Sequence, residues 1–439
     1  MRPVDLSPVS PDDQTQRPFD LFLIFVGANI VATTLQAGAS LPASLGLRAA
    51  ALVIGVGAIG GAAFTAALAP IGSRLRVPSI VASRAVLGWS GASLLALLLF
   101  LTNFAWIALN NAIAASIVAR MAGVGAPEAW AVALGLAATA IVLGGPRAAA
   151  LVDRVAVPLL LASGVVFTVA CLRATPPTWP ERPAPAADLV RGLDIVAGYQ
   201  VSWLLMFADY PRFVRSGRAA GTAVFLGLAL TALWFMPLGL VAAAVAGSAD
   251  PGAMVAALGL GWWGALLVAV AALTTNFVNI YMSALAFKSL RPSAGGATAV
   301  WVVGGIGAAL GLLSAGLLER FAGFTLVLAG GLVPIGGILL AHYVVLRRPV
   351  HVPDLYDEAG PYAALGGWSS AGVPAWVAGA VVFYLAGDIG ATLPSLVAAM
   401  AVYIAVTIRT GRRRAPRPTV AVAANPGSPP LNRQVPPSS

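Results

Sequence analysis

The chain has 439 residues, of which 59% are hydrophobic and only 10% are charged. Soluble domains carry about 25% charged residues, so this composition excludes a water-soluble globular protein. The formal net charge is +10. Its arginines lie at the ends of apolar stretches and in the C-terminal tail rather than on one basic surface with interleaved aromatic residues, which argues against binding of nucleic acid.

Twelve apolar stretches are candidates to cross a hydrocarbon core, which takes about 20 helical residues. In chain order they are residues 20–41, 49–72, 90–118, 128–144, 148–170, 192–210, 220–246, 254–285, 298–316, 321–345, 373–387 and 391–409. Repeated glycines in the second stretch, at Gly55, Gly57, Gly60 and Gly61, are typical of membrane helices that pack closely. We therefore predict an all-α polytopic protein of the lipid bilayer with about 12 transmembrane helices.

Lys and Arg are unevenly divided between the two sides of these spans. With the N-terminus inside, the inner segments hold 20 of the 26 and the outer segments hold 6. Because cytoplasmic segments carry the excess of Lys and Arg, we predict that both termini are cytoplasmic and that the protein lies in the inner (plasma) membrane. The polar N-terminal residues lack the pattern of a cleaved signal peptide.

The spans and polar segments divide the chain into seven parts. They are a cytoplasmic N-terminal segment (1–19), spans 1–5 (20–170), an extracytoplasmic loop (171–191), spans 6–10 (192–346), a cytoplasmic loop (347–372), spans 11–12 (373–410) and a C-terminal tail (411–439). The tail is rich in Arg, Pro and Ser, so we expect it to be disordered.

Polar side chains inside a span are costly in hydrocarbon and therefore mark candidate functional sites. Here they concentrate in spans 1, 3, 6 and 8, and within a span they follow one helical stripe, as Asn29, Thr33 and Gln36 do at i, i+4 and i+7. The set is Asn29, Thr33, Thr34 and Gln36; Asn103, Trp106, Asn110 and Asn111; Tyr199, Gln200, Ser202 and Trp203; and Thr274, Thr275, Asn276, Asn279 and Tyr281.

One pair of polar spans therefore recurs five spans later. A unit with an odd number of crossings is inverted in its copy, and inverted repeats around a central site with interrupted helices are typical of secondary transporters. Gly27, Gly38 and Gly198 are positions at which these spans could unwind. A lone Thr pair usually bonds back to its own helix and a lone Asn usually joins two helices, but their recurrence in four spans favours a shared central site.

Four segments in order along the chain resemble one known family. They are Val77–Arg84 with Gly88–Gly91 after span 2, Ser202-Trp203 with Ala208–Phe213 at the end of span 6, Thr274–Ser283 in span 8, and Val333–Gly337 through Tyr343 in span 10. They resemble the nucleobase–cation symporter family, in its purine–cytosine permease branch. The resemblance implies a leucine-transporter-type fold of ten core helices in two inverted five-helix repeats, with two peripheral helices.

The resemblance also implies a Na⁺ site between spans 1 and 8, with Na⁺ as the coupling ion and no other cofactor. Its ligands would be the carbonyls of Gly27, Ile30 and Ala271 and the hydroxyls of Thr274 and Thr275. Neutral oxygens of this kind suit a hard monovalent cation, and an interrupted helix frees carbonyls to supply them.

A small heterocyclic substrate is implied in the same way. Trp106 would stack on the flat ring, with Asn103 and Asn110 beside it and with Asn276 and Asn279 completing the recognition, since amides pair with ring carbonyls and N–H groups. Span 6 departs from the pattern of several members, because Tyr199-Gln200 stands where an aromatic residue closes the opposite ring face. Either Tyr199 takes that role or Gln200 replaces stacking with hydrogen bonds.

An enzyme is the main rival from another class, and it would need clustered His, Cys or carboxylate groups. His342 and His351 lie at a span end and in a loop, and Cys171 is the single cysteine. The acidic residues near spans lie toward span edges: Asp153, Asp194, Asp209 and Asp388. We interpret Asp209 as a salt-bridge partner of Arg212 or Arg215, and we expect no enzyme activity.

Other transport functions stay open. A channel would line one pore rather than distribute amides and a tryptophan over separate spans. A proton-coupled carrier would need a central titratable group, and none is evident. A symporter of the same fold for a hydroxymethylpyrimidine, a hydantoin, allantoin or an amino acid remains an alternative to one for cytosine or a purine.

Overall fold

The computed structural model describes residues 5–123, 126–174, 178–179, 183–313, 321–387 and 390–413. Across these ranges the chain forms helices and no strand, which confirms the predicted all-α class. Nine of the described helices are long and apolar enough to cross a membrane, or ten if a bent pair counts as one span. Two shorter helices cover the predicted spans 4 and 6, so the count of 12 stays a prediction.

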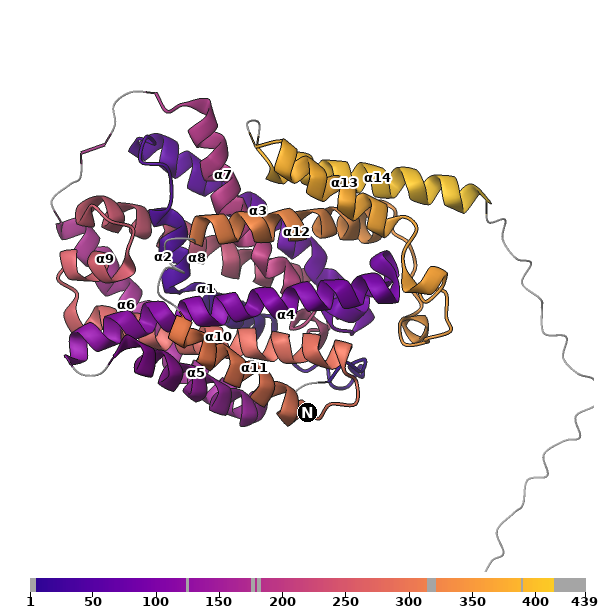
Figure 1. Cartoon of the computed structure of the whole chain (residues 1–439), viewed down its shortest axis with the longest axis horizontal. Helices are drawn as coiled ribbons and strands as arrows, with labels where there is room; N and C mark the ends of the chain where they lie inside the picture. The colour runs from indigo at the N-terminus through magenta and orange to yellow at the C-terminus, as the bar shows by residue number, and fades with distance from the viewer. Residues whose placement is uncertain are drawn as a thin grey trace, which may run out of the picture.

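The helices of the first half follow the predicted spans 1–5 (Figure 1). They are α1 (Pro18–Asn29), α2 (Ala32–Ala39), α3 (Leu47–Leu75), α4 (Ser79–Ala122), α5 (Pro127–Leu143) and α6 (Gly145–Arg173). Helix α4 is interrupted at Gly88, whose φ of 78° lies in the region that favours glycine. The part of α4 after this kink corresponds to the predicted span 3.

The second half repeats this order and ends in two peripheral helices. Its helices are α7 (Ala186–Val201), α8 (Gly217–Ala246), α9 (Pro251–Ala257), α10 (Gly261–Leu290), α11 (Gly296–Leu310), α12 (Phe321–Leu340), α13 (Gly372–Leu385) and α14 (Thr392–Arg413). Helix α14 continues past the predicted end of span 12, and residues 414–439 of the predicted tail lie outside the described ranges. In Figure 1, α13 and α14 lie together at one edge of the molecule beside α12.

Helices that lie five spans apart pack extensively on one another. The pairs are α3 with α8, α4 with α10 and α5 with α11, which correspond to spans 2 and 7, 3 and 8, and 4 and 9. Two inverted five-span repeats meeting around a central axis would produce this pairing.

Span 1 is a broken helix. Helices α1 and α2 meet at an angle of 59° around Ile30 and Val31, so the break does not fall at Gly27 or Gly38. Those glycines lie inside helical segments and allow close packing instead: a Cβ on Gly27 would lie 3.1 Å from Val157, and one on Gly38 would lie 1.9 Å from the carbonyl oxygen of Met236.

Span 6 is also interrupted. Helix α7 ends at Val201, after Gly198, and the chain continues as a 3₁₀ turn over Ser202–Met206. Both interrupted segments lie in the spans for which the sequence predicted unwinding. The interruptions release backbone groups and side chains toward the centre of the bundle.

Asp209, beyond this turn, corrects the sequence-based interpretation. No direct ion pair joins its carboxylate to Arg212 or Arg215 within the described residues, although the positive charge of Arg212 still attracts it. The Asp209 carboxylate instead accepts from the backbone N–H of Ser79 at 3.2 Å, and Arg212 Nε donates to the Asp209 carbonyl at 3.2 Å. Asp209 therefore satisfies a buried N–H group at the start of α4 that has no partner within the helix.

Asp194 of α7 joins the peripheral helices to the core. Its buried carboxylate accepts from the backbone N–H groups of Ala391 and Thr392 at 2.8 and 2.9 Å, where α14 begins. We expect Asp194→Ala to lower the free energy of unfolding by about 1–3 kcal/mol, because two buried donors lose their acceptor. Thermal melting in detergent checks this, with exposed Asp12→Ala as the control. Equal melting temperatures for the two variants would contradict the anchoring role.

Candidate functional site

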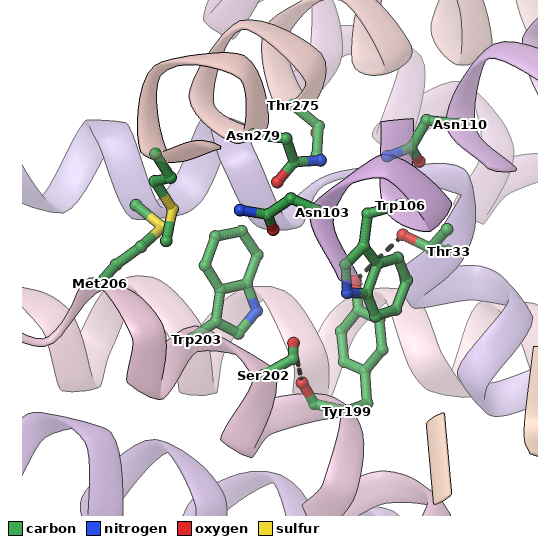
Figure 2. Close-up of a pocket in the computed structure, with 11 residues that line it drawn as sticks. Thr33, Asn103, Trp106, Asn110, Tyr199, Ser202, Trp203, Met206, Thr275 and Asn279 are labelled. Carbon is green, nitrogen blue, oxygen red and sulfur yellow. Dashed lines mark hydrogen bonds between the residues drawn. The ribbon is translucent and has the colours of Figure 1, made fainter. Parts of the chain in front are cut away.

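A pocket lies between the two interrupted spans and helices α4 and α10 (Figure 2). The space not filled by atoms in and around the pocket, its open side included, is about 430 Å³. It is lined by Thr33 of α2; Asn103, Trp106 and Asn110 of α4; Tyr199 of α7; Ser202, Trp203 and Met206 of the 3₁₀ turn; and Thr275, Asn279 and Met282 of α10. The lining therefore comes from spans 1, 3, 6 and 8, which are the four spans that the sequence singled out.

Aromatic rings form two sides of the pocket. Trp106 and Tyr199 lie edge to face, with ring centroids 6.1 Å apart and planes at 83°. Trp203 lies apart from Trp106 in the view of Figure 2, and both indole rings line the pocket. The pocket therefore contains two indole rings on which a flat apolar ring could stack.

The polar atoms of the pocket are amides and hydroxyls. Asn103 is 3% exposed, and its Nδ2 has no hydrogen-bond partner among the described residues. An unpaired buried N–H group is unfavourable by about 1–3 kcal/mol, so this group at the pocket is free to donate to an acceptor on a ligand or to a water. The amide of Asn279 on α10 lines the same pocket. No Asp, Glu, His, Lys or Arg is among the lining residues.

Asn276 holds α10 to α4 rather than lining the pocket. Its Oδ1 accepts from Asn110 Nδ2 at 3.3 Å, and its Nδ2 donates to Asn111 Oδ1 at 2.7 Å and to the Ile107 carbonyl at 3.3 Å. This amide network fixes the face of α4 that carries Trp106 and Asn110.

Three other candidate residues lie outside the lining. Gln200 Nε2 donates to the carbonyls of Ala58 and Leu228 at 3.5 and 3.3 Å. Gln36 Nε2 donates to Ser40 Oγ at 3.4 Å, one turn along α2. The amide of Asn29 bonds to α8 and to Trp203. Of the pair left open in span 6, Tyr199 is therefore the residue at the pocket.

Tyr199 is held by the hydroxyls of span 1. Its OH group lies 2.7 Å from Thr34 Oγ1 and 3.2 Å from Thr33 Oγ1. These contacts join the start of α2 to the end of α7. They place the ring of Tyr199 against the edge of the pocket that Trp106 forms.

The predicted cation ligands lie where the end of α1 meets α10. Thr275 Oγ1 donates to the Ala28 carbonyl at 3.3 Å, and Thr274 Oγ1 donates to the Ala271 carbonyl at 3.0 Å. The last carbonyls of a helix lack partners within the helix. At the end of α1 the Asn29 carbonyl accepts from Thr34 Oγ1, whereas no bond of the described residues uses the carbonyls of Gly27 and Ile30.

This region offers neutral oxygens rather than a transition-metal site. Within the described ranges no three His, Cys, Asp or Glu residues lie close enough to share a metal ion. Hydroxyls and helix-end carbonyls are the donors that suit Na⁺, so the residues present are compatible with the implied ion.

Four pocket residues were assigned from sequence neither to the substrate nor to the cation: Ser202, Trp203, Met206 and Met282. Helical spacing could have found three of them. Tyr199, Trp203 and Met206 follow one another at i, i+4 and i+7, and Thr275, Asn279 and Met282 do the same.

The sequence pattern of one family, described as permeases for cytosine/purines, uracil, thiamine and allantoin, matches residues 8–405. The protein belongs to this family. Among its relatives, the cytosine permease of Escherichia coli (strain K12) is 28% identical over 352 residues, covering 77% of this chain and 81% of that protein. The putative purine-cytosine permease YxlA of Bacillus subtilis (strain 168) is 25% identical over 377 residues, covering 78% and 79%.

Solved structures of Mhp1, a nucleobase-cation-symport-1 family transporter, share the fold. The closed conformation with bromovinylhydantoin bound aligns with a TM-score of 0.79 at 19% identity, covering 93% of this permease and 95% of Mhp1. The inward-facing conformation aligns with a TM-score of 0.74 over the same shares. These comparisons confirm the predicted resemblance and the leucine-transporter-type fold. The permease is therefore a multi-pass secondary transporter and not an enzyme.

Proposed function

We propose that this permease takes up a nucleobase or a related flat heterocycle together with Na⁺ by alternating access. The observation that carries the proposal is the unpaired, buried Nδ2 of Asn103 in a pocket that the indole rings of Trp106 and Trp203 also line. A flat ring in this pocket could stack on an indole while a ring carbonyl or nitrogen accepts from Asn103.

The neutral lining supports a neutral heterocycle over an amino acid. The pocket lining contains no charged side chain to pair with the carboxylate or the ammonium group of a zwitterion. The names of the relatives, which refer to cytosine, purine and a bound hydantoin, support the same class. Binding measurements over a panel of bases and hydantoins, with thiamine and allantoin, identify which heterocycle of this class is the substrate.

The end of α1 supports Na⁺ as the coupling ion. A cation held by the carbonyls of Gly27 and Ile30 and by Thr275 would fasten α1 to α10. Thr275 also lines the pocket, so the ion and the substrate would share one residue. Proton coupling lacks support at this place, because no pocket-lining residue is an Asp, a Glu or a His.

Substrate-induced thermal stabilisation of the purified permease tests the proposal. We expect one heterocycle of the panel to raise the melting temperature in sodium chloride and to do so much less in choline chloride. No shift for any heterocycle in either salt would reject the substrate class. An equal shift in both salts would reject sodium coupling while leaving the substrate class in place.

Thr275→Val is expected to raise the sodium concentration for half-maximal substrate binding about tenfold or more. The valine keeps the shape of the side chain but removes the hydroxyl, and a bond to a charged group contributes about 1.5–3 kcal/mol. Thr65→Val is the matched control, because Thr65 is a buried threonine of α3 whose hydroxyl has no partner among the described residues. Similar sodium requirements in the two variants would argue against Thr275 as a ligand.

A further inference from the structure

Asn29 is fully buried at the end of α1, and its carboxamide is bonded at both ends. Oδ1 accepts from the indole N–H of Trp203 at 3.2 Å. Nδ2 donates to Thr231 Oγ1 at 2.7 Å and to the Leu228 carbonyl at 3.3 Å, both in α8. The side chain therefore spans from α8 to a wall of the pocket without lining the pocket itself.

The chemistry of its partners fixes the orientation of this amide. An indole N–H can only donate, so it must face Oδ1, and a carbonyl can only accept, so Leu228 must face Nδ2. Thr231 Oγ1 donates its own proton to the Gly227 carbonyl at 2.6 Å, which leaves it to accept from Nδ2. Every partner therefore requires the same orientation of Asn29.

The backbone carbonyl of Asn29 is linked through Thr34 to Tyr199, the second aromatic residue of span 6 at the pocket. Its carbonyl accepts from Thr34 Oγ1 at 2.6 Å, and that hydroxyl lies 2.7 Å from the OH group of Tyr199. Since Thr34 has given its proton to the carbonyl, Tyr199 must donate to Thr34. Trp203 is thus bonded to Asn29 directly, and Tyr199 is linked to Asn29 through Thr34. Both aromatic residues line the pocket.

The proposed cation ligands lie directly around Asn29 in the chain. Gly27 and Ile30 flank it, and the carbonyl of Ala28, the residue before it, accepts from Thr275. A cation bound by these carbonyls would fix the backbone of residues 27–30, which otherwise ends a helix without bonds for two of its carbonyls. Fixing this backbone also fixes where the Asn29 side chain presents Oδ1 to Trp203.

We propose that Asn29 is a positioning residue that couples cation binding at the end of α1 to the Trp203 and Tyr199 wall of the substrate pocket. This inference rests on the proposed sodium-coupled function and names the path by which the ion increases substrate affinity. Linkage makes the effect reciprocal: the factor by which sodium increases substrate affinity equals the factor by which substrate increases sodium affinity.

Trp203→Phe tests the path, because it keeps an aromatic wall and removes the N–H group that Asn29 accepts. The measured quantity is the ratio of substrate affinity in saturating sodium to substrate affinity in choline, using the heterocycle that stabilises the wild type. We expect Trp203→Phe to lower this ratio about three- to tenfold, which corresponds to the loss of one buried hydrogen bond. The matched control is Trp234→Phe on α8, which removes an indole bond to Thr168 of α6, outside the pocket.

Asn29→Ala and the double variant Asn29→Ala/Trp203→Phe test whether Asn29 and Trp203 act along one path. If the two residues act along one path, the double variant will have the same ratio as Asn29→Ala alone. Should Asn29→Ala fail to fold, Trp203→Phe still gives the ratio. A fall in affinity of equal size in sodium and in choline would make Trp203 an ordinary pocket residue and overturn the coupling role.

The sodium dependence of substrate binding by the wild type distinguishes failure of the Asn29 role from failure of sodium coupling itself. A sodium-dependent wild type with an unchanged ratio in Trp203→Phe would overturn the role of Asn29 alone. A wild type that binds its heterocycle equally in sodium and choline would overturn sodium coupling and the role of Asn29 together. A reduced ratio in Trp203→Phe, unchanged in Trp234→Phe, supports the proposal.

Discussion

Trp106→Ala is expected to weaken binding of the heterocyclic substrate by about 5- to 150-fold. Stacking of a base on an aromatic side chain contributes about 1–3 kcal/mol, and each 1.4 kcal/mol is a factor of ten in affinity. Trp106 is 8% exposed and lies against the space that Asn103 and Trp203 also border. Removal of its ring leaves the substrate without one wall. Isothermal titration or thermal stabilisation over a substrate series measures the loss.

Trp262→Ala provides the control for this variant. Trp262 is 61% exposed at the start of α10 and is not among the pocket residues, so its replacement should leave affinity unchanged. Trp106→Phe, which keeps a smaller ring, should retain part of the affinity. An affinity of Trp106→Ala within twofold of the wild type would exclude stacking on this residue as the basis of recognition.

Helical spacing predicted much of the pocket because α4 and α10 are regular where they line it. Asn103, Trp106 and Asn110 occupy one stripe of α4, and the structure places all three at the pocket. Thr275 and Asn279 do the same on α10. Met282 continues the stripe on α10, but an apolar side chain inside a membrane span gives no signal for a site.

Span 1 shows why the same reasoning fails at a broken helix. Asn29, Thr33 and Gln36 share a stripe only if the helix is continuous, and the bend of 59° between α1 and α2 breaks the period between the first two. Only Thr33 reaches the pocket. Tertiary contacts hold the bent span, such as the bonds of the Asn29 amide to Leu228 and Thr231 of α8, and no local residue pattern encodes these.

The glycines of span 2 show that composition does not predict which face of a helix packs closely. Gly57 and Gly61 lie against α7, where an added Cβ would come 2.7 Å from Val196 and 2.5 Å from Gln200. Gly55 and Gly60 have no heavy atom within 4 Å of such a Cβ. The expectation of close packing is confirmed for one face of the helix. Composition alone could not tell which face, because a small residue is also tolerated toward lipid.

Gly239→Ala is expected to destabilise the permease by about 3 kcal/mol or more and to prevent normal assembly of α2 against α8. A Cβ on Gly239 would lie 1.9 Å from the carbonyl oxygen of Leu35, and one on Gly38 would lie 1.9 Å from the carbonyl oxygen of Met236. These are backbone atoms, so no side-chain rotation relieves the overlap and the helices must separate. Thermal melting in detergent and the yield of monodisperse protein measure the effect.

Gly60→Ala is the matched control for Gly239→Ala, because it makes the same change inside a membrane helix where nothing obstructs the new methyl group. It should be neutral or slightly stabilising, since alanine restricts the unfolded chain more than glycine does. The contact of α2 with α8 also determines where Thr33 and Thr34 meet Tyr199. Any Gly239→Ala protein that does fold should therefore bind substrate more weakly than Gly60→Ala. Equal stability and equal affinity of the two variants would show that α2 can move away from α8 without disturbing the pocket.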